Sequence, residues 1–310
     1  MKIYHGLDDF TRLDYAVVTS GIFDGTHVGH QKILSRLREI AEKNHGETVV
    51  ITYWPHPRLL LHPEDTSLKL LNTFEEKAEL LKEYGVQHLI RIPFTKEFSQ
   101  ITSDEFIKKI LVDTIGTKML VIGYDHRFGK NREGSFEQLI LNAPKYGFEV
   151  EEIPRQDIDH LAVSSTKIRH ALEAGDIDTS IQLIGKPYSL TGRVVKGDKI
   201  GRLMGFPTAN IEVDTNYKLI PSDGIYAVIV KHEHKTYGGM LYIGYRPTIN
   251  GTKRNIEVNI FDFNEEIYGE SITVFFQKMI RGDKKFNDLE ELKKQLQQDK
   301  IDSLRALEKH

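Results

Sequence analysis

The sequence feature that most constrains the fold is the segment at residues 21–30, which reads GIFDGTHVGH. It follows an apolar run at residues 15–19 and precedes a helical pattern of apolar side chains over residues 33–40. This order predicts a strand, a tight glycine turn and the start of an amphipathic helix. A helix N-terminus has unpaired backbone N–H groups and a partial positive charge, so we expect this turn to bind phosphate oxygens.

Two histidines in this turn suit a particular chemistry. His27 and His30 are three residues apart, so they share a helix face and can both point at one phosphate. Gly25 and Gly29 let a ligand approach the backbone closely. When pyrophosphate leaves, negative charge gathers on the α-phosphoryl oxygens of ATP, and imidazole N–H donors stabilise it. We expect nucleotidyl transfer without a covalent intermediate, although either histidine alone would be typical of a structural residue.

Strand-like and helical patterns alternate from the start of the chain to about residue 152. The predicted strands lie at residues 15–21, 48–53, 88–92, 119–123 and 148–153. The predicted helices lie at residues 30–43, 74–84, 103–112 and 134–146. Such alternation indicates a parallel sheet covered on both faces, in which ligands collect at the carboxyl ends of the strands.

Three further segments follow predicted strands of this half or precede a helix. The prolines at residues 54–57 (WPHP) stiffen a loop that could wall a base or flavin pocket, and a plain turn is the alternative. In residues 123–132 (GYDHRFGKNR), Phe128 is suited to stack on a ring while a neighbouring cation meets phosphate, and a solvated loop is the alternative. In residues 164–169 (SSTKIR), the hydroxyls could cap a helix or bind phosphates, and Arg169 would neutralise the β/γ end.

The spacing of apolar residues changes to a two-residue alternation near residues 185–187 (GKP). This change predicts a domain boundary there, with domains at 1–185 and 186–310. The predicted strands of the second half lie at residues 188–195, 224–231, 237–243, 255–261 and 272–276. Their two-residue alternation and glycine turns indicate a small antiparallel barrel or sandwich. Leu289, Leu292 and Leu296 predict an amphipathic C-terminal helix that covers one face of this sheet.

The second half also contains a glycine-rich run at residues 197–210 (GDKIGRLMGFPTAN) that does not fit the Walker A pattern. Its glycines free the backbone to wrap an anion, and Thr208 and Asn210 offer the hard oxygen ligands that suit Mg²⁺. Glu257 lies on a predicted strand, where its carboxylate could accept the proton of an attacking alcohol. A turn-rich hairpin and a solvated glutamate are the alternatives.

Length, charge and cysteine content limit the classes of function and partner that the chain can have. The 310 residues suit two domains, and 42 basic against 45 acidic residues give a net charge of −3. Bulk charge therefore suggests neither a nucleic-acid nor a membrane partner. The absence of cysteine excludes disulfides, thiolate catalysis and cysteine-bound metals, and the N-terminus lacks the pattern of a signal peptide. We expect a cytoplasmic protein.

The motifs together resemble a known family. Residues 21–30 resemble the signature of the HxGH nucleotidylyltransferases, in the form found in bacterial bifunctional riboflavin kinase/FAD synthetases. Residues 55–57, 123–129 and 164–169 are similar to further motifs of the adenylyltransferase half. Residues 197–210, 244–248 and 268–269, together with Glu257, resemble riboflavin kinase. The resemblance implies an α/β plus all-β chain: a Rossmann-like HxGH nucleotidylyltransferase domain, then a small antiparallel riboflavin kinase barrel with a C-terminal helix.

This resemblance also implies site residues. It implies that His27, His30 and Arg169 are catalytic residues that act on the phosphates of ATP. It also implies that Glu257 is the general base for the ribityl 5′-hydroxyl. Further ATP contacts are implied for Gly21, Phe23, Asp24, Gly25, Gly29, Ser164, Ser165, Thr166, Gly197, Lys199, Gly201, Arg202 and Pro207. Flavin contacts are implied for Pro57, Asp125, Arg127 and Phe128, and Mg²⁺ contacts for Thr208 and Asn210. His126, Lys196 and Asn259 depart from the residues that are common in the family.

The implied activity is two-step flavin cofactor synthesis: riboflavin and ATP give FMN, and FMN and ATP give FAD and pyrophosphate, both with Mg²⁺. Three alternatives stay open: a chain that keeps only one activity, a flavin- and ATP-sensing protein, and an HxGH enzyme with another acceptor. A weak or transient homo-oligomer is also kept open.

Overall fold

The computed structural model describes residues 1–65, 67–154, 163–197, 201, 205–248 and 251–308. The chain divides into two compact units, Met1–Ser165 and Thr166–His310. None of the helices in the described ranges has the length and apolar content needed to span a bilayer.

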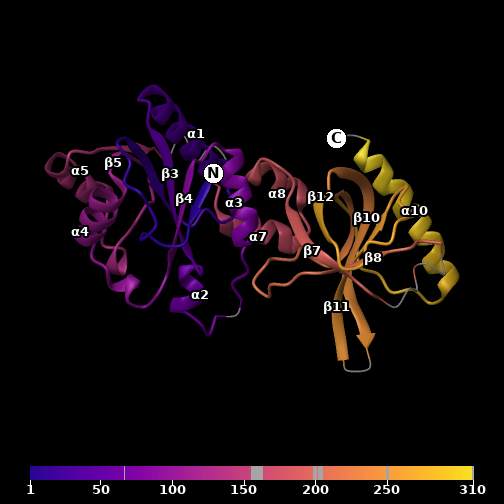
Figure 1. Ribbon diagram of the computed structural model, residues 1–310. Coiled ribbons are helices and arrows are strands. Elements are labelled where there is room, and N and C mark those ends of the chain that lie inside the picture. The colour runs from indigo at the N-terminus through magenta and orange to yellow at the C-terminus, as the bar shows by residue number, and fades with distance from the viewer. Residues whose placement is uncertain (66, 155–162, 198–200, 202–204, 249–250, 309–310) are drawn as a thin grey trace. The chain divides into compact units, whose positions relative to one another are not determined.

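The first unit is built on a six-stranded sheet in the order β1-β4-β3-β2-β5-β6, with every neighbouring pair parallel (Figure 1). Its strands are β1 (Lys2–Tyr4), β2 (Ala16–Ser20), β3 (Glu47–Trp54), β4 (His88–Pro93), β5 (Thr117–Gly123) and β6 (Glu149–Ile153). The parallel sheet predicted from the alternating pattern is thereby confirmed. The three-residue strand β1 was not predicted.

Helices cover both faces of this sheet because successive strand residues point to opposite sides. Val17 packs in one core with helices α1 (Val28–Lys43) and α3 (Phe74–Glu83). Val18 packs in the other core with helix η2 (Phe106–Ile115) and helix α5 (Phe136–Tyr146). The remaining short helices are α2 (Pro57–Leu61), η1 (Phe98–Gln100), α4 (Ser103–Glu105) and η3 (Lys130–Arg132).

Local signals in the sequence fix several helix ends. The Thr73 and Glu76 side chains form a capping box at the start of α3, which satisfies backbone N–H groups that the helix leaves unpaired. The segment predicted as one helix at residues 103–112 is instead α4 followed by η2, a π-helix that ends at Gly116 with φ of 79°. Helix α2, after the WPHP segment, was not predicted.

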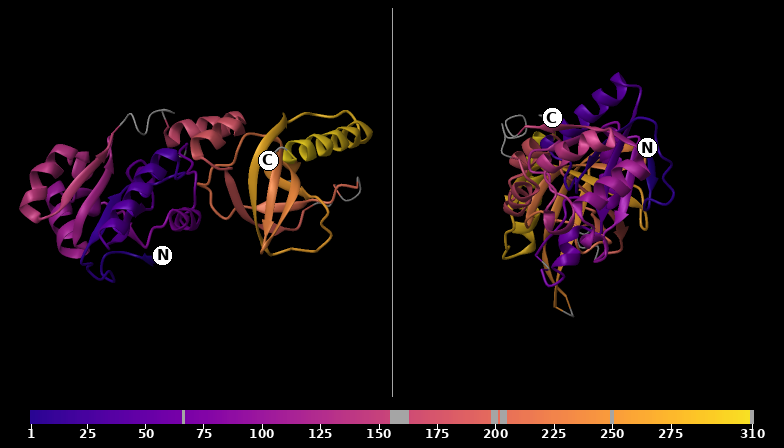
Figure 2. Two further views of the ribbon diagram at one scale, coloured as in Figure 1. Left: turned by 90° about the horizontal axis from the view of Figure 1, so that it is seen from above. Right: turned by 90° about the vertical axis from the view of Figure 1, so that its left-hand side faces the viewer.

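The second unit contains a closed barrel in the order β10-β11-β8-β7-β12-β9, with every pair antiparallel. Its strands are β7 (Ser189–Val195), β8 (Ala209–Glu212), β9 (Gly224–His232), β10 (Lys235–Thr248), β11 (Gly251–Ile260) and β12 (Ser271–Gly282). The C-terminal helix α10 (Leu289–Leu307) lies along the barrel, as predicted (Figure 2). Its Leu296 and Leu307 pack on a small barrel core that includes Phe261.

Two helices precede the barrel in the second unit, α7 (Ser165–Ala174) and α8 (Ile177–Ile184). They are tied to the barrel unit: the backbone N–H of Ser222 donates to the Leu172 carbonyl at 3.1 Å. The division into compact units therefore falls between residues 165 and 166, at the first residue of α7. The functional boundary at residues 185/186 stays a prediction.

Candidate functional site

The turn after β2 is held in an unusual backbone conformation by buried hydrogen bonds. Phe23, Gly25 and Thr26 have positive φ angles of 52°, 84° and 36°. The Asp24 carboxylate is 3% exposed and accepts hydrogen bonds from the backbone N–H groups of Leu71, at 3.0 Å, and Asn72, at 3.2 Å. Asp24 therefore fixes the turn to the segment before α3, and its direct contact with ATP stays a prediction.

His27 and His30 lie together at the start of α1. His27 is the N-cap residue, and its Nδ1 accepts a hydrogen bond from the His30 backbone N–H at 3.4 Å. The two imidazole rings stack, with centroids 3.7 Å apart and an interplanar angle of 16°. The buried ring of Phe23 lies against His30 at 4.9 Å between centroids. The structure thus brings together the two histidines that the sequence singled out, and it gives Phe23 a supporting position.

Burial keeps both imidazoles neutral at pH 7. It lowers the pKa of His27 to about 4, although the nearby Asp24 carboxylate opposes the shift. It also lowers the pKa of His30 well below the usual value, and the charges of His27 and Lys77 act in the same direction. His30 Nδ1 is a buried atom with no hydrogen-bond partner within the described ranges. Each neutral ring can donate one N–H, which suits a developing negative charge.

The depressed pKa of His27 predicts how stability depends on pH. Between pH 6.5 and 4 the unfolded chain binds a proton at residue 27 that the folded chain does not, so the free energy of unfolding falls as pH falls. His27 alone should contribute about 3 kcal/mol across this window. Urea unfolding followed by Trp54 fluorescence measures it. His27→Asn should make the free energy of unfolding depend less on pH, whereas His45→Asn, at an exposed site, should not. A wild-type free energy of unfolding that is constant from pH 6.5 to 4 would contradict the assignment.

The residues predicted to contact flavin in the loop after β5 differ in their exposure. Asp125 and Arg127 are exposed. Phe128 is 5% exposed and packs in the core against Phe106 and His126, with ring centroids 5.4 and 5.8 Å away. A flavin contact by Phe128 stays a prediction, but its position is that of a core residue. Pro57 occupies the first turn of α2.

His126 occupies a polar position at the carboxyl edge of the sheet. Its Nε2 lies 3.3 Å from the Ser20 hydroxyl at the end of β2, and burial lowers the pKa of this histidine to about 4. Burial also raises the pKa of Tyr53, opposed by a hydrogen bond with the same Ser20 hydroxyl. The departure from the family pattern thus places a neutral imidazole in a partly buried hydrogen-bonded pair.

The serine motif at residues 164–166 meets the start of α7. Ser165 Oγ donates a hydrogen bond to the backbone carbonyl of Asp24 at 2.8 Å, which links this motif to the histidine turn. Arg169 lies one turn into α7. Phosphate contacts by Ser164, Ser165, Thr166 and Arg169 stay predictions.

Glu257 lies on β11 and points into the second unit's site. The side chain is 5% exposed, and its Oε2 accepts a hydrogen bond from Thr208 Oγ1 at 3.1 Å. Asn210 on β8 pairs directly with Glu257 across the sheet. Asn259 donates from Nδ2 to the Pro207 carbonyl at 2.7 Å. The predicted base and the predicted Mg²⁺ ligands are therefore close together, and the departing residue Asn259 supports the strand that carries them.

Glycine is required at two positions of the adjoining loop. A Cβ at Gly197 would collide with the Asn210 side chain, and one at Gly201 would collide with the Phe206 carbonyl. The loop backbone thus packs closely on the predicted metal ligands. Lys199 and Arg202, also predicted to contact phosphate, lie outside the described residues.

Two cavities meet at Thr208. The larger, of about 220 Å³, is lined by Glu257 and Thr208 and by apolar side chains that include Phe206, Met240 and Phe286. The smaller, of about 120 Å³, is lined by Thr208, Ala209, Phe263, Glu266 and Tyr268. The Thr208 hydroxyl therefore lies beside both cavities, and the Glu257 carboxylate lies beside the larger, more apolar one.

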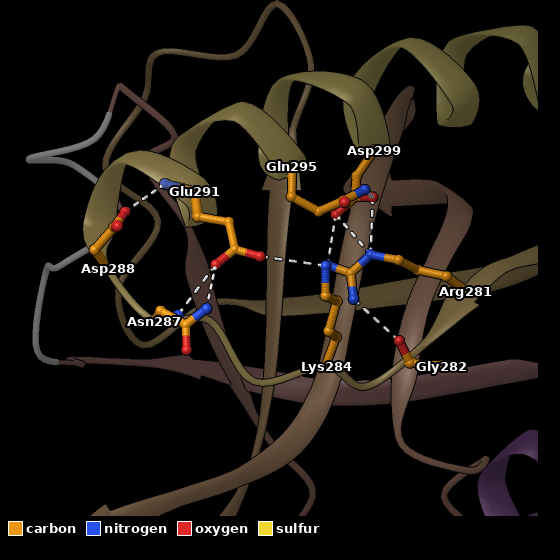
Figure 3. Close-up of polar contacts among 8 residues, drawn as sticks. All are labelled: Arg281, Gly282, Lys284, Asn287, Asp288, Glu291, Gln295 and Asp299. Carbon is orange, nitrogen blue, oxygen red and sulfur yellow. Dashed lines mark hydrogen bonds and ion pairs between the residues drawn. The ribbon is translucent and has the colours of Figure 1, made fainter.

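A buried ion pair between Arg281 and Asp299 anchors α10 (Figure 3). Arg281 also lines the larger cavity. Asp299 is 1% exposed and accepts from Arg281 Nη2 at 2.7 Å and from Arg281 Nε at 2.9 Å. Gln295 donates to the same carboxylate at 2.8 Å, and Lys284 pairs with Glu291 at 3.4 Å. Sequence reasoning missed these residues, although Asp299 follows Leu296 by three positions on the apolar stripe of the helix.

Asp299→Ala should strongly destabilise the barrel, because it leaves the Arg281 guanidinium partly buried without its carboxylate. We expect a loss of about 3 kcal/mol in the free energy of unfolding. Asp302→Ala, which removes a partly exposed carboxylate from the same helix, is the matched control and should change it by less than about 0.5 kcal/mol. Urea unfolding monitored by circular dichroism measures both. Equal effects of the two substitutions would contradict the anchoring role.

A parallel α/β unit with a histidine turn and a barrel with a buried carboxylate define a chain with two separate candidate sites. The FAD synthetase family model matches residues 10–167, and the riboflavin kinase family model matches residues 184–307. These two matches fall on the two units and between them span nearly the whole chain.

Full-length relatives agree with the family models. "Bifunctional riboflavin kinase/FMN adenylyltransferase" proteins are 37% identical in Listeria monocytogenes, 36% in Buchnera aphidicola and 34% in Escherichia coli. The alignments cover 96–97% of this chain and 93–96% of the relatives. This chain therefore belongs to the bifunctional riboflavin kinase/FMN adenylyltransferase family.

A solved structure shares the same fold. The protein from Streptococcus pneumoniae described as a macrolide-efflux protein has a TM-score of 0.88 and 32% identity, with 97% of each chain covered. The likeness confirms the fold class of both units.

Proposed function

We propose that the His27–His30 turn catalyses adenylylation of FMN and that the Thr208–Glu257 pair catalyses phosphorylation of riboflavin. The two reactions are those of the family to which the chain belongs. The observation that supports the assignment most is the pairing, in separate units, of stacked neutral imidazoles and a buried carboxylate beside a hydroxyl.

In the first reaction, a phosphate oxygen of FMN attacks the α-phosphorus of ATP. The bond from that phosphorus to the bridging oxygen breaks, and pyrophosphate leaves with the bonding electrons. The imidazole N–H groups of His27 and His30 donate to the α-phosphoryl oxygens, where negative charge increases in the transition state. Ser164 and Arg169 bind the β- and γ-phosphates in this proposal.

In the second reaction, the ribityl 5′-hydroxyl of riboflavin attacks the γ-phosphorus of ATP. Glu257 accepts the hydroxyl proton, and ADP leaves as the β–γ bridging bond breaks. The larger, apolar cavity suits the isoalloxazine ring, and the smaller cavity suits the nucleotide. Since Thr208 lines both, the phosphoryl group crosses from one cavity to the other beside it.

Thr208 and Asn210 are the residues that would hold Mg²⁺ in the barrel. A hydroxyl and an amide oxygen are hard ligands, and the buried Glu257 carboxylate adds negative charge beside them. The ion, when bound with ATP, neutralises phosphate charge. The cytoplasmic location and a weak homo-oligomer stay predictions from the sequence.

Assays of both reactions, with and without Mg²⁺, test the proposal. Riboflavin with ATP should give FMN and ADP, and FMN with ATP should give FAD and pyrophosphate, each followed by chromatography. EDTA should stop both reactions, and excess Mg²⁺ should restore them. Formation of only one product would favour a chain with a single active half. Binding of flavin and ATP without either product would favour a sensing protein.

A further inference from the structure

Lys77 on α3 is a buried cation that the two proposed reactions do not use. It is 2% exposed, one of the largest fully buried side chains of the protein. Its Nζ lies 5.4 Å from the centroid of the Trp54 ring. Among the described residues, Nζ makes no hydrogen bond and no ion pair within 4 Å. Burying the side chain of an ammonium group is costly, because water solvates its charge less well than at the surface.

The surroundings of Lys77 show where its charge acts. Trp54 ends β3 at the carboxyl edge of the sheet, next to the end of β2 that leads into the histidine turn. The Lys77 charge contributes to the lowered pKa of His30, and the Asp24 charge raises the pKa of Lys77 against a larger effect of burial. Lys77 therefore faces the same small region as His30 and Asp24.

Hydrogen bonds hold Lys77 in place relative to the histidines. The Asp24 carboxylate binds the backbone of Leu71 and Asn72, and the Asn72 side chain accepts from the Gly25 N–H at 2.8 Å. Thr73 then caps α3, with Lys77 one turn further on. The turn and the start of α3 are thus one hydrogen-bonded assembly, and the Lys77 side chain that projects from it is buried rather than on the surface.

The charge balance of the turn gives this lysine a function. Both imidazoles are neutral at pH 7, so the histidines supply donors but no positive charge. The phosphates that react in adenylyl transfer carry several negative charges, which a cation in a low-dielectric site stabilises strongly. Burial lowers the pKa of Lys77 to about 8, so it is still mostly protonated at pH 7.

We propose that Lys77 is a further catalytic residue of adenylyl transfer, whose ammonium binds a phosphoryl oxygen beside His30. The inference rests on the role proposed above for the histidine turn. The oxygen belongs either to the α-phosphate of ATP or to the phosphate of FMN, and both share the chemistry of a phosphate anion.

Charge-removing and charge-keeping variants of the full-length protein test this role. Lys77→Met should lower kcat/KM for FAD formation by about 100-fold, the effect of removing one oxyanion donor. Lys77→Arg keeps the charge and should retain at least tenfold more activity than Lys77→Gln. Lys82→Met, on the exposed side of α3, is the matched control and should leave FAD formation unchanged. FMN formation from riboflavin, measured on the same preparations, should stay within twofold throughout.

The kinetic constants identify the phosphate. A rise in KM confined to ATP assigns the ammonium to the α-phosphate, and a rise confined to FMN assigns it to the acceptor. A fall in kcat alone assigns it to charge that develops in the transition state. The sole tryptophan, Trp54, adds a binding signal: α,β-methylene-ATP should change its fluorescence in the wild type and much less in Lys77→Met.

Two results would overturn the inference. Lys77→Met could retain FAD formation within threefold, which would make the lysine dispensable. Alternatively, Lys77→Arg and Lys77→Gln could lose FAD formation equally together with thermal stability, which would make its role structural. His27→Ala separates this failure from a failure of the proposed function: if it abolishes FAD formation while Lys77→Met does not, only the lysine assignment is wrong.

Discussion

His27→Ala should reduce FAD formation from FMN by about 1,000-fold, near the upper end of the effect of removing one oxyanion-type donor. The reason is that His27 and His30 form a stacked pair, so removing one ring also removes the support of the other. FMN formation from riboflavin should change by less than twofold, because Glu257 and Thr208 belong to the other compact unit.

The substitution has a structural side effect that needs its own control. His27 caps α1, and loss of a cap typically costs about 1 kcal/mol. His27→Asn restores a side-chain acceptor at the cap without the imidazole, so it should regain stability but not FAD formation. Loss of both activities in a folded His27→Ala protein would show that the two reactions are not divided between the units as proposed.

Glu257→Gln should produce the opposite pattern, with FMN formation lowered by about 1,000-fold, within the range for loss of a general base. FAD formation from supplied FMN should be retained. Glutamine keeps an oxygen that can accept the Thr208 hydrogen bond, so the fold should persist while the proton acceptor is lost.

The control for this variant is Glu212→Gln on the neighbouring strand β8, where the carboxylate is exposed. It should leave both activities unchanged. Equal rates of FMN formation in the wild type and Glu257→Gln would remove Glu257 as the base. A loss of FAD formation from supplied FMN in folded Glu257→Gln would contradict the independence of the two sites.

The spacing of apolar residues in the sequence predicted the strands and helices that bury one or both of their faces in a core. The five predicted strands of the first unit and the five of the second all exist, because their apolar residues meet a core on a regular period. The missed strand β1 is three residues long and mostly exposed, so it shows no alternation. The helical pattern at residues 103–112 did not distinguish an α-helix from a π-helix, since both bury a similar stripe.

The candidate sites were predictable where a motif is local. The histidine turn and the Thr208 to Asn210 segment each lie within a few residues, so backbone geometry alone brings their side chains together. Residues that depend on tertiary packing were missed. Lys77 shares the apolar stripe of α3 with Phe74 and Leu81, just as Asp299 shares that of α10. A charge on an apolar stripe is therefore a usable signal for a buried ion.

The most direct test of the account is a crystal structure of the protein with α,β-methylene-ATP and Mg²⁺. We expect imidazole nitrogens of His27 and His30 within hydrogen-bonding distance, about 3 Å, of the α-phosphate oxygens. An α-phosphate bound elsewhere, with the two rings still stacked and buried away from it, would contradict the central claim.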